Sequence, residues 1–167
     1  AIASHKPGVI TKVGTKTFVD PRIDGGKVND AAENSGENIV ELLDLHGSEY
    51  LFYPAFPIDV AIIKGSIADR DGNISIEKEA IHIEQFEMAA AARNSGGIVM
   101  VQVDRIVDHG GIHPQMVTVP STLVDYVIQG TPGNTGQHFI PDQDFVPSWC
   151  GDEKIPFGDI KPLPLDT

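Results

Sequence analysis

The chain has 167 residues, with 24 acidic against 12 basic side chains, and its formal net charge is −12. Such a surface repels phosphate backbones and anionic lipid, so we expect neither nucleic acid nor a membrane as a partner. Hydrophobic residues make up 41% of the sequence, yet no apolar run approaches the ~20 residues that span a bilayer. The single cysteine, Cys150, cannot form an internal disulfide, which favours a cytoplasmic location.

Before residue 58 the sequence predicts short strands joined by polar loops. The expected strands cover residues 9–13, 40–45 and 50–53. The last two flank residues 46–49 and are predicted to form a hairpin. We expect residues 15–26 to form an extended loop, because Pro21 disfavours helix at Asp20. Residues 29–38 are polar and are expected to be irregular.

The stretch over residues 58–80 is the most informative part of the chain. Val60–Ile63 is a continuous apolar run, typical of a strand that is buried on both faces. Asp71-Gly72 suits a tight hairpin turn. Residues 73–76 then alternate polar and apolar side chains, as a half-buried strand does. These residues alone predict a sheet.

A helix is predicted from His82 to Asn94, with Ile83, Phe86 and Ala90 on one face at helical spacing. Gly96 is placed to end this helix as a C-terminal cap.

Two further apolar runs, Ile98–Val103 and Leu123–Ile128, are predicted to be buried strands. A strand-helix-strand unit over residues 58–104 implies a right-handed parallel crossover. The predicted fold class is therefore α/β with a mixed sheet. We expect an α/β domain over residues 1–129 and an irregular tail over residues 130–167, which holds six of the 12 prolines.

Besides residues 58–80, six blocks resemble consecutive blocks of one enzyme family. They are Pro7–Gly14, Thr17–Arg22, Gly25–Lys27, Glu49–Tyr53, Asn94–Asp104 and Pro162–Asp166. In this order and spacing they resemble the family I CoA-transferases, in particular the single-chain acetate/propionate CoA-transferase branch. The resemblance runs from about residue 3 to residue 166.

The resemblance implies a fold like one half of a two-half architecture. It also implies transfer of CoA between a short-chain acyl-CoA and a free carboxylate, by covalent catalysis. In the family, a Glu forms an acyl anhydride and then a glutamyl-CoA thioester. The segment that carries this Glu is expected to lie outside the chain, which would be a middle portion and inactive alone. Coenzyme A is then a substrate, with no permanently bound cofactor.

The implied partners are acyl-CoA, a carboxylic acid and the second half of the enzyme, and a homo-oligomer is expected. We also expect the strands Val60–Ile63, Ile98–Val103 and Leu123–Ile128 to leave an apolar surface open, because the tail offers only scattered aromatic side chains as cover. The isolated chain should therefore be marginally soluble or self-associating, and should bind the second half. An alternative is a stand-alone, non-catalytic binding or scaffolding module with the same fold.

The predicted substrate-binding residues are Gly14, Lys16, Thr17 and Phe18. In the family this loop lies toward the active-site cleft and has a second glycine where Lys16 stands here. Since glycine lets a backbone approach a ligand closely, Lys16 would narrow the acyl pocket or offer a cation to a carboxylate or a CoA phosphate. A purely structural loop is the other interpretation.

Several other patterns have a chemical interpretation that we weigh against a structural one. Glu33–Gly36 is similar to the family's catalytic Glu-Asn-Gly segment but contains an extra serine, so a surface loop is favoured. Residues 69–73 lack the first and last ligands of an EF-hand. Asp108, His109 and His113 have the spacing of a zinc pair, which a metal-dependent hydrolase would use, but Gly110-Gly111 indicates a loop. We therefore predict no metal site.

Overall fold

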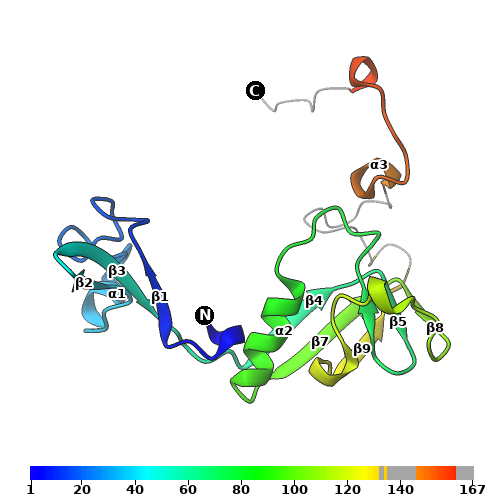
Figure 1. The fold of residues 1–167 in the computed structure, drawn as a ribbon, viewed down its shortest axis with the longest axis horizontal. Coiled ribbons are helices and arrows are strands. Elements are labelled where there is room, and N and C mark those ends of the chain that lie inside the picture. Colours follow the sequence, from blue (N-terminus) through cyan, green and yellow to red (C-terminus); the bar gives the residue numbers. More distant parts are fainter. Residues whose placement is uncertain (132–133, 135–145, 161–167) are drawn as a thin grey trace. The chain divides into compact units, whose positions relative to one another are not determined.

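The computed structural model describes residues 1–131, 134 and 146–160, and the elements are labelled in Figure 1. The chain divides into two compact units. One unit holds Ala1–Asp59 and Ala90–Gly97, and the other holds Val60–Ala89 and the described residues from Ile98 onward. The predicted boundary after residue 129 stays a prediction. Much of the expected tail, with the resembling block Pro162–Asp166, lies outside the described residues.

The first unit is built on an antiparallel sheet with the strand order β1-β3-β2. These strands are β1 (Gly8–Thr11), β2 (Glu41–Leu45) and β3 (Ser48–Pro54), and a 3-10 helix, Ile2–Ser4, precedes them. The predicted hairpin is confirmed, but its turn is tighter than expected. His46 and Gly47 connect the strands, and both have positive φ angles, 54° and 75°, as a type I′ turn requires.

Two loop predictions in this unit are wrong. Residues 15–26 form a series of turns and are not extended, because buried Asp20 accepts hydrogen bonds from the backbone N–H groups of Lys16 and Arg22. Within the segment expected to be irregular, a short helix forms, α1 (Asp30–Asn34). Asn29 caps it by accepting a hydrogen bond from the N–H of Ala32 at 2.9 Å.

The second unit contains a parallel sheet with the order β4-β7-β9 (Figure 1). Its strands are β4 (Val60–Lys64), β7 (Ile98–Val103) and β9 (Tyr126–Gln129). Parallel β4 and β7 are joined through α2 (Gln85–Asn94), which confirms the predicted strand-helix-strand crossover. The last predicted strand starts later than expected, because a 3-10 helix occupies Ser121–Leu123.

The crossover helix differs from its prediction at its start and in its buried face. It begins at Gln85, three residues later than predicted, and Phe86 is exposed, whereas Gln85, Ala89 and Ala92 are buried. Its predicted end is confirmed. Gly96 has a φ of 77°, and the N–H of Gly97 donates to the carbonyl of Ala92 at 2.8 Å.

A small mixed sheet with the order β6-β5-β8 completes the second unit. It consists of β5 (Ile67–Asp69), β6 (Ile74–Ser75) and β8 (Arg105–Val107). Strands β5 and β6 are antiparallel, which confirms the predicted hairpin turn, and β5 pairs with β8 in parallel. The strands β5 and β8 themselves were not predicted. Short helices follow at Pro114–Met116, α3 (Pro147–Cys150) and Phe157–Asp159. The predicted α/β class is confirmed, with three small sheets in the described part of the chain.

The two burial predictions for residues 58–80 are both wrong. In β4, Ala61 and Ile63 are buried, but Val60 and Ile62 are 48% and 77% exposed. The strand is therefore covered on one face only. The second strand was expected to be half-buried, yet Ser75 is as fully buried as its two isoleucine neighbours.

Candidate functional site

The predicted substrate-binding loop, Gly14–Phe18, is a compact series of hydrogen-bonded turns after β1. The N–H and the hydroxyl of Thr17 both donate to the carbonyl of Gly14, at 3.1 and 2.8 Å. The N–H and the hydroxyl of Thr15 donate in the same way to the carbonyl of Lys12, at 3.2 and 2.8 Å. The Thr17 hydroxyl thus donates its proton within the loop. Its oxygen can still accept a hydrogen bond from a ligand.

Gly14 is required by its conformation and by its surroundings. Its φ is 94°, a region that L-residues with side chains rarely adopt. A Cβ at this position would lie 2.5 Å from the Tyr53 hydroxyl oxygen and 2.6 Å from Cγ2 of Val19. The same Tyr53 hydroxyl donates to the carbonyl of Val13 at 3.1 Å. Gly14 therefore fixes the path of the loop against β3.

Lys16 also lies in the left-handed region, with a φ of 61°. A residue with a Cβ pays a conformational cost there that glycine does not. The family resemblance implies a glycine at this position, and the backbone of the loop fits one. The conformation is held because the Lys16 N–H donates to Oδ2 of Asp20 at 2.8 Å.

Asp20 organises the loop from a buried position, with 1% of its side chain exposed. Arg22 binds it through two parallel hydrogen bonds, Nε to Oδ1 at 2.9 Å and a terminal nitrogen to Oδ2 at 2.8 Å. The other terminal nitrogen of Arg22 donates to Glu49 at 2.8 Å. The side-chain hydrogen bond from Arg22, followed by the backbone hydrogen bond from Lys16, holds the pKa of Asp20 far below its usual range. Asp20 is therefore ionised at neutral pH.

This support leaves three of the predicted residues available at the surface. Lys16, Thr17 and Phe18 are exposed, and Phe18 is 56% exposed. Together they present an ammonium group, a hydroxyl oxygen and an aromatic face on a hydrogen-bonded backbone. Such a set can hold an anionic group beside an apolar one. Contact with a substrate remains a prediction.

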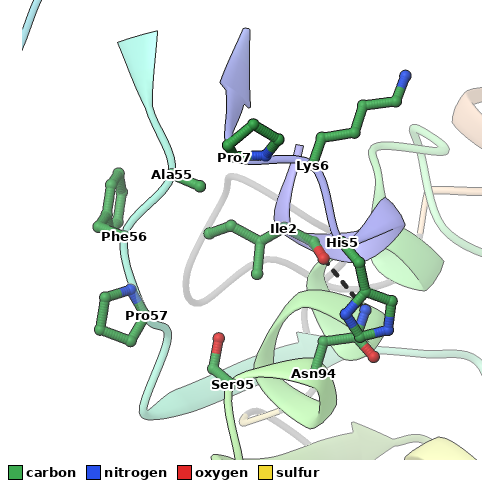
Figure 2. Close-up of a pocket in the computed structure, with 9 residues that line it drawn as sticks. All are labelled: Ile2, His5, Lys6, Pro7, Ala55, Phe56, Pro57, Asn94 and Ser95. Atoms are coloured by element: carbon green, nitrogen blue, oxygen red, sulfur yellow. Dashed lines mark hydrogen bonds between the residues drawn. The ribbon is translucent and has the colours of Figure 1, made fainter.

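A pocket of about 350 Å³ lies elsewhere in the same unit. Its lining is drawn in Figure 2 and consists of Ile2, His5, Lys6, Pro7, Ala55, Phe56, Pro57, Asn94 and Ser95. The Ile2 side chain extends toward the segment 55–57, whereas Lys6 points away from it (Figure 2). The Asn94 side chain links the end of α2 to the 3-10 helix Ile2–Ser4 by donating to the carbonyls of Ile2 and Ala3, each at 3.1 Å.

The lining of this pocket combines five apolar residues with the polar residues His5, Lys6, Asn94 and Ser95 (Figure 2). It contains none of the predicted substrate-binding residues. The sequence gives little indication of it, because its lining comes from three separate segments with no shared motif.

A polar cluster lies at the carboxyl ends of the parallel strands, where α/β sheets commonly place ligands. The Lys64 ammonium donates to Glu79 at 3.0 Å, to Asp104 at 2.7 Å and to the carbonyl of Gly65 at 2.8 Å. These acceptors use all three of its N–H bonds. Lys64 therefore ties the end of β4 to its neighbours and has no donor left for a ligand. Sequence reasoning missed this cluster, although Lys64 directly follows the apolar run.

The turn over residues 69–73 is structural. Oδ1 of Asp69 accepts hydrogen bonds from the N–H groups of Asp71 and Asn73, and Oδ2 accepts one from the Asn73 side chain at 3.0 Å. Burial alone would raise the pKa of Asp69, but these hydrogen bonds outweigh it and lower the pKa. The carboxylate is thus occupied by its own turn.

The histidine motif does not assemble into a metal site. Nδ1 of His109 lies 2.7 Å from Asp71, Asp108 lies 3.4 Å from Arg70, and His113 accepts the N–H of Gln115. Within residues 1–131, 134 and 146–160, no three His, Cys, Asp or Glu side chains gather as metal ligands would. Glu33, the other catalytic candidate, lies exposed in α1.

The geometry thus defines an α/β protein with a parallel crossover unit and a hydrogen-bonded loop that contains a glycine. The sequence profile of the Coenzyme A transferase family matches residues 1–130. The chain belongs to the Coenzyme A transferase family, which confirms the resemblance seen in its sequence blocks. In the described part of the chain, the helices are too short or too polar to cross a membrane.

Two relatives of this chain are CoA-transferases. Caffeate CoA-transferase of Acetobacterium woodii is 43% identical over 98% of this chain, which covers 30% of the relative. Acetate CoA-transferase YdiF of Escherichia coli strain K12 is 39% identical over 77% of this chain, which covers 24% of that enzyme. The chain therefore spans less than a third of the length of these relatives.

A solved structure agrees with these relatives. The thioester complex with CoA of the acyl-CoA transferase YdiF from E. coli O157:H7 has a TM-score of 0.83 and 35% sequence identity with the chain. The similarity covers 93% of this chain and 29% of the crystallised one. The fold described above is thus that of a portion of an acyl-CoA transferase.

Proposed function

We propose that this chain is a portion of a CoA-transferase that moves CoA between a short-chain acyl-CoA and a free carboxylate. The observation that carries the proposal is the 43% identity with caffeate CoA-transferase over 98% of this chain, in which the chain corresponds to 30% of the relative. The acetate CoA-transferase and the CoA thioester complex of YdiF add support for the same chemistry.

The proposed reaction uses a Glu that lies outside this chain. Its carboxylate attacks the acyl-CoA thioester, which forms an acyl-glutamyl anhydride and releases CoA thiolate. The thiolate attacks the glutamyl carbonyl, so a glutamyl-CoA thioester forms and the acid leaves. An incoming carboxylate then reverses these two steps and carries CoA away. No proton, oxidant or metal is consumed in this exchange.

In this proposal the loop supplies part of the substrate pocket. Lys16 places a cation near a carboxylate or a CoA phosphate, and Phe18 and the backbone at Gly14 and Thr17 border the acyl group. The exposure of Lys16, Thr17 and Phe18 supports this role, as does the rigid backbone beneath them. CoA enters and leaves as a substrate.

We further propose that the complete enzyme is cytoplasmic and forms a homo-oligomer. The single cysteine supports this location, because secreted domains of this size often rely on disulfides. Sedimentation of the complete enzyme tests the oligomeric state.

The test replaces the matching segment of the A. woodii caffeate CoA-transferase with this chain. We expect the chimaera to transfer CoA to caffeate, and borohydride to trap a glutamyl thioester on a Glu outside the exchanged segment. The unmodified relative is the control. A folded chimaera without turnover contradicts the proposal.

The isolated chain is the second arm of the test. We expect no turnover from acetyl-CoA and propionate, because the nucleophile is missing. Turnover, or a trapped adduct on Glu33, would show that the chain carries its own nucleophile.

A further inference from the structure

The left-handed backbone at Lys16 is held differently from the other positions of this kind. In the described residues, the non-glycine residues with a positive φ are His5, Lys16, His46 and Glu84. His5 and His46 occupy a helix cap and a hairpin turn, where this conformation is common. At Lys16 a buried carboxylate, Asp20, accepts the N–H group at 2.8 Å. Strained residues persist where their surroundings determine them, and they gather at ligand sites.

Asp20 accepts four hydrogen bonds, all from its own loop. Oδ1 accepts one from the N–H of Arg22 at 3.0 Å and one from its Nε at 2.9 Å. Oδ2 accepts one from the N–H of Lys16 and one from a terminal nitrogen of Arg22, each at 2.8 Å. A carboxylate has about four acceptor positions in total. Asp20 therefore has no acceptor left for a ligand, so any effect on a substrate must pass through Lys16 or Arg22.

Strand β3 anchors the loop on both sides of Lys16. On one side, the hydroxyl of Tyr53 donates to the carbonyl of Val13 at 3.1 Å. On the other side, the second terminal nitrogen of Arg22 donates to Glu49 at 2.8 Å. Both Glu49 and Tyr53 belong to β3. The backbone around Lys16 is thus tied to a strand by hydrogen bonds, while the Lys16 residue itself is exposed.

We propose that Asp20 is a positioning residue for substrate binding, which acts by holding the Lys16 ammonium beside an anionic group of the substrate. This inference rests on the proposed function, in which Lys16 lies at the substrate pocket. The anionic group is the carboxylate of the acid or a phosphate of CoA. A cation on a hydrogen-bonded backbone loses less conformational freedom on binding, so it distinguishes better between substrates that place this anion differently.

The test compares Asp20→Asn with the unmodified loop in the caffeate CoA-transferase chimaera. An asparagine has nearly the same shape, but its amide presents a donor where the carboxylate accepts. We expect the KM for the acid or for the acyl-CoA to rise by at least about fivefold, with kcat changed by less than about twofold, because the contact serves binding. The substrate whose KM rises identifies the anion that Lys16 holds. Asp24→Asn is the control, because Asp24 is an exposed aspartate of the same loop, and it should leave both KM values unchanged.

A double-mutant cycle separates this positioning role from a general loss of structure. Lys16→Ala removes the cation but keeps a Cβ at the same position. In that background, Asp20→Asn should leave both KM values within about twofold, because no cation remains to be positioned. Equal effects of Asp20→Asn with and without the cation overturn the proposal, since Asp20 would then act only on the fold.

Hydrogen exchange of the Lys16 amide in the folded chimaera gives a readout that needs no turnover. Exchange should be at least about tenfold faster in Asp20→Asn, because the N–H loses its acceptor. An unchanged exchange rate overturns the proposal. If circular dichroism shows that Asp20→Asn is unfolded, Arg22→Lys takes its place, because it keeps the charge but loses the two parallel hydrogen bonds. It should raise the same KM, and a folded Arg22→Lys variant with unchanged KM values also overturns the proposal.

The two proposals fail differently in these experiments. An active chimaera whose KM values do not respond to Asp20→Asn retains the proposed function and rejects the positioning role. An inactive chimaera rejects the proposed function, and calorimetric binding of CoA and of caffeate then tests Asp20. Weaker binding of one of them by Asp20→Asn supports the positioning role. Equal binding of both, or no binding by either protein, rejects it.

Discussion

The β4 strand and the β5-β6 hairpin lie next to each other in sequence and have similar apolar content, but they differ in burial. Val60 and Ile62 of β4 face solvent, whereas Ile74 and Ser75 in β6 are at most 1% exposed. In β6, Ile74 is also bridged to the buried residue Val119, whereas β4 is covered on one side only. Apolar composition therefore shows where burial is possible, and packing decides whether it occurs.

The largest expected difference separates Ile74 from Ile62. Ile74→Ala should lower the free energy of unfolding by about 2–5 kcal/mol, because it leaves a cavity in a packed interior. Ile62→Ala should change it by less than about 0.5 kcal/mol in the isolated chain, because this side chain is already hydrated. Urea unfolding of both variants measures the difference. Equal losses would show that the comparison between β4 and β6 is wrong.

A substitution at Gly65 tests the packing between the end of β4 and strand β6. A Cβ there would lie 2.5 Å from Cγ2 of Ile74 and 3.3 Å from the carbonyl of Ser75. Gly65→Ala should therefore lower the free energy of unfolding by about 1–3 kcal/mol through overpacking. Gly158→Ala is the control, because no atom lies within 4 Å of the added Cβ. A neutral Gly65→Ala variant, measured by urea unfolding, would mean that the junction is loosely packed.

Lys16 extends the comparison to an exposed residue whose backbone, unlike that of Ile62, is strained. Lys16→Gly should raise the free energy of unfolding by up to about 1 kcal/mol, because glycine adopts the left-handed conformation without the steric cost of a Cβ atom. Lys16→Ala removes the charge but retains the conformation, so it should not gain this stability. Thermal unfolding of the isolated chain distinguishes the two variants.

The same substitution also tests the role of the loop in catalysis. In the active chimaera, Lys16→Gly should change the acyl preference or the KM for CoA by a few-fold, on the order of 1 kcal/mol. Unchanged kinetics for every substrate would show that the loop is only structural.

The last expected effect is a pH dependence from Asp20, a buried carboxylate whose partner Arg22 is 42% exposed. The lowered pKa means that its ion pair stabilises the protein above the ordinary carboxyl pKa of about 4. This contribution is lost as the pH falls further toward the folded-state pKa. The stability difference between the wild type and Asp20→Asn should therefore shrink between pH 7 and pH 2, as measured by urea unfolding. A constant difference would exclude ionisation of Asp20 as its source.

Local sequence patterns predicted the positions of helices, strands and turns better than they predicted which side chains are buried. The turn at His46-Gly47 and the end of α2 at Gly96 follow from short-range backbone preferences, and both are present in the structure. The helix α1 was missed because it depends on one side-chain cap from Asn29. In the candidate site, the left-handed backbone conformation of Lys16 agrees with the glycine that the family resemblance implies at this position. The Lys64 cluster was missed, since Glu79 and Asp104 join it from distant segments.

The sequence by itself determined the family, the α/β class and the strand-helix-strand crossover, because these depend on local periodicity and on blocks of residues in a fixed order. The tertiary structure decided which faces of the strands are buried. It also decided how Asp20 and Arg22 fold residues 15–26 into turns, and which carboxylates pair with the Lys64 ammonium. These features depend on contacts between residues far apart in the chain. An apolar strand has the same alternating side chains whether one layer or two cover it, so only the packed structure distinguishes the exposed side of β4 from its buried side.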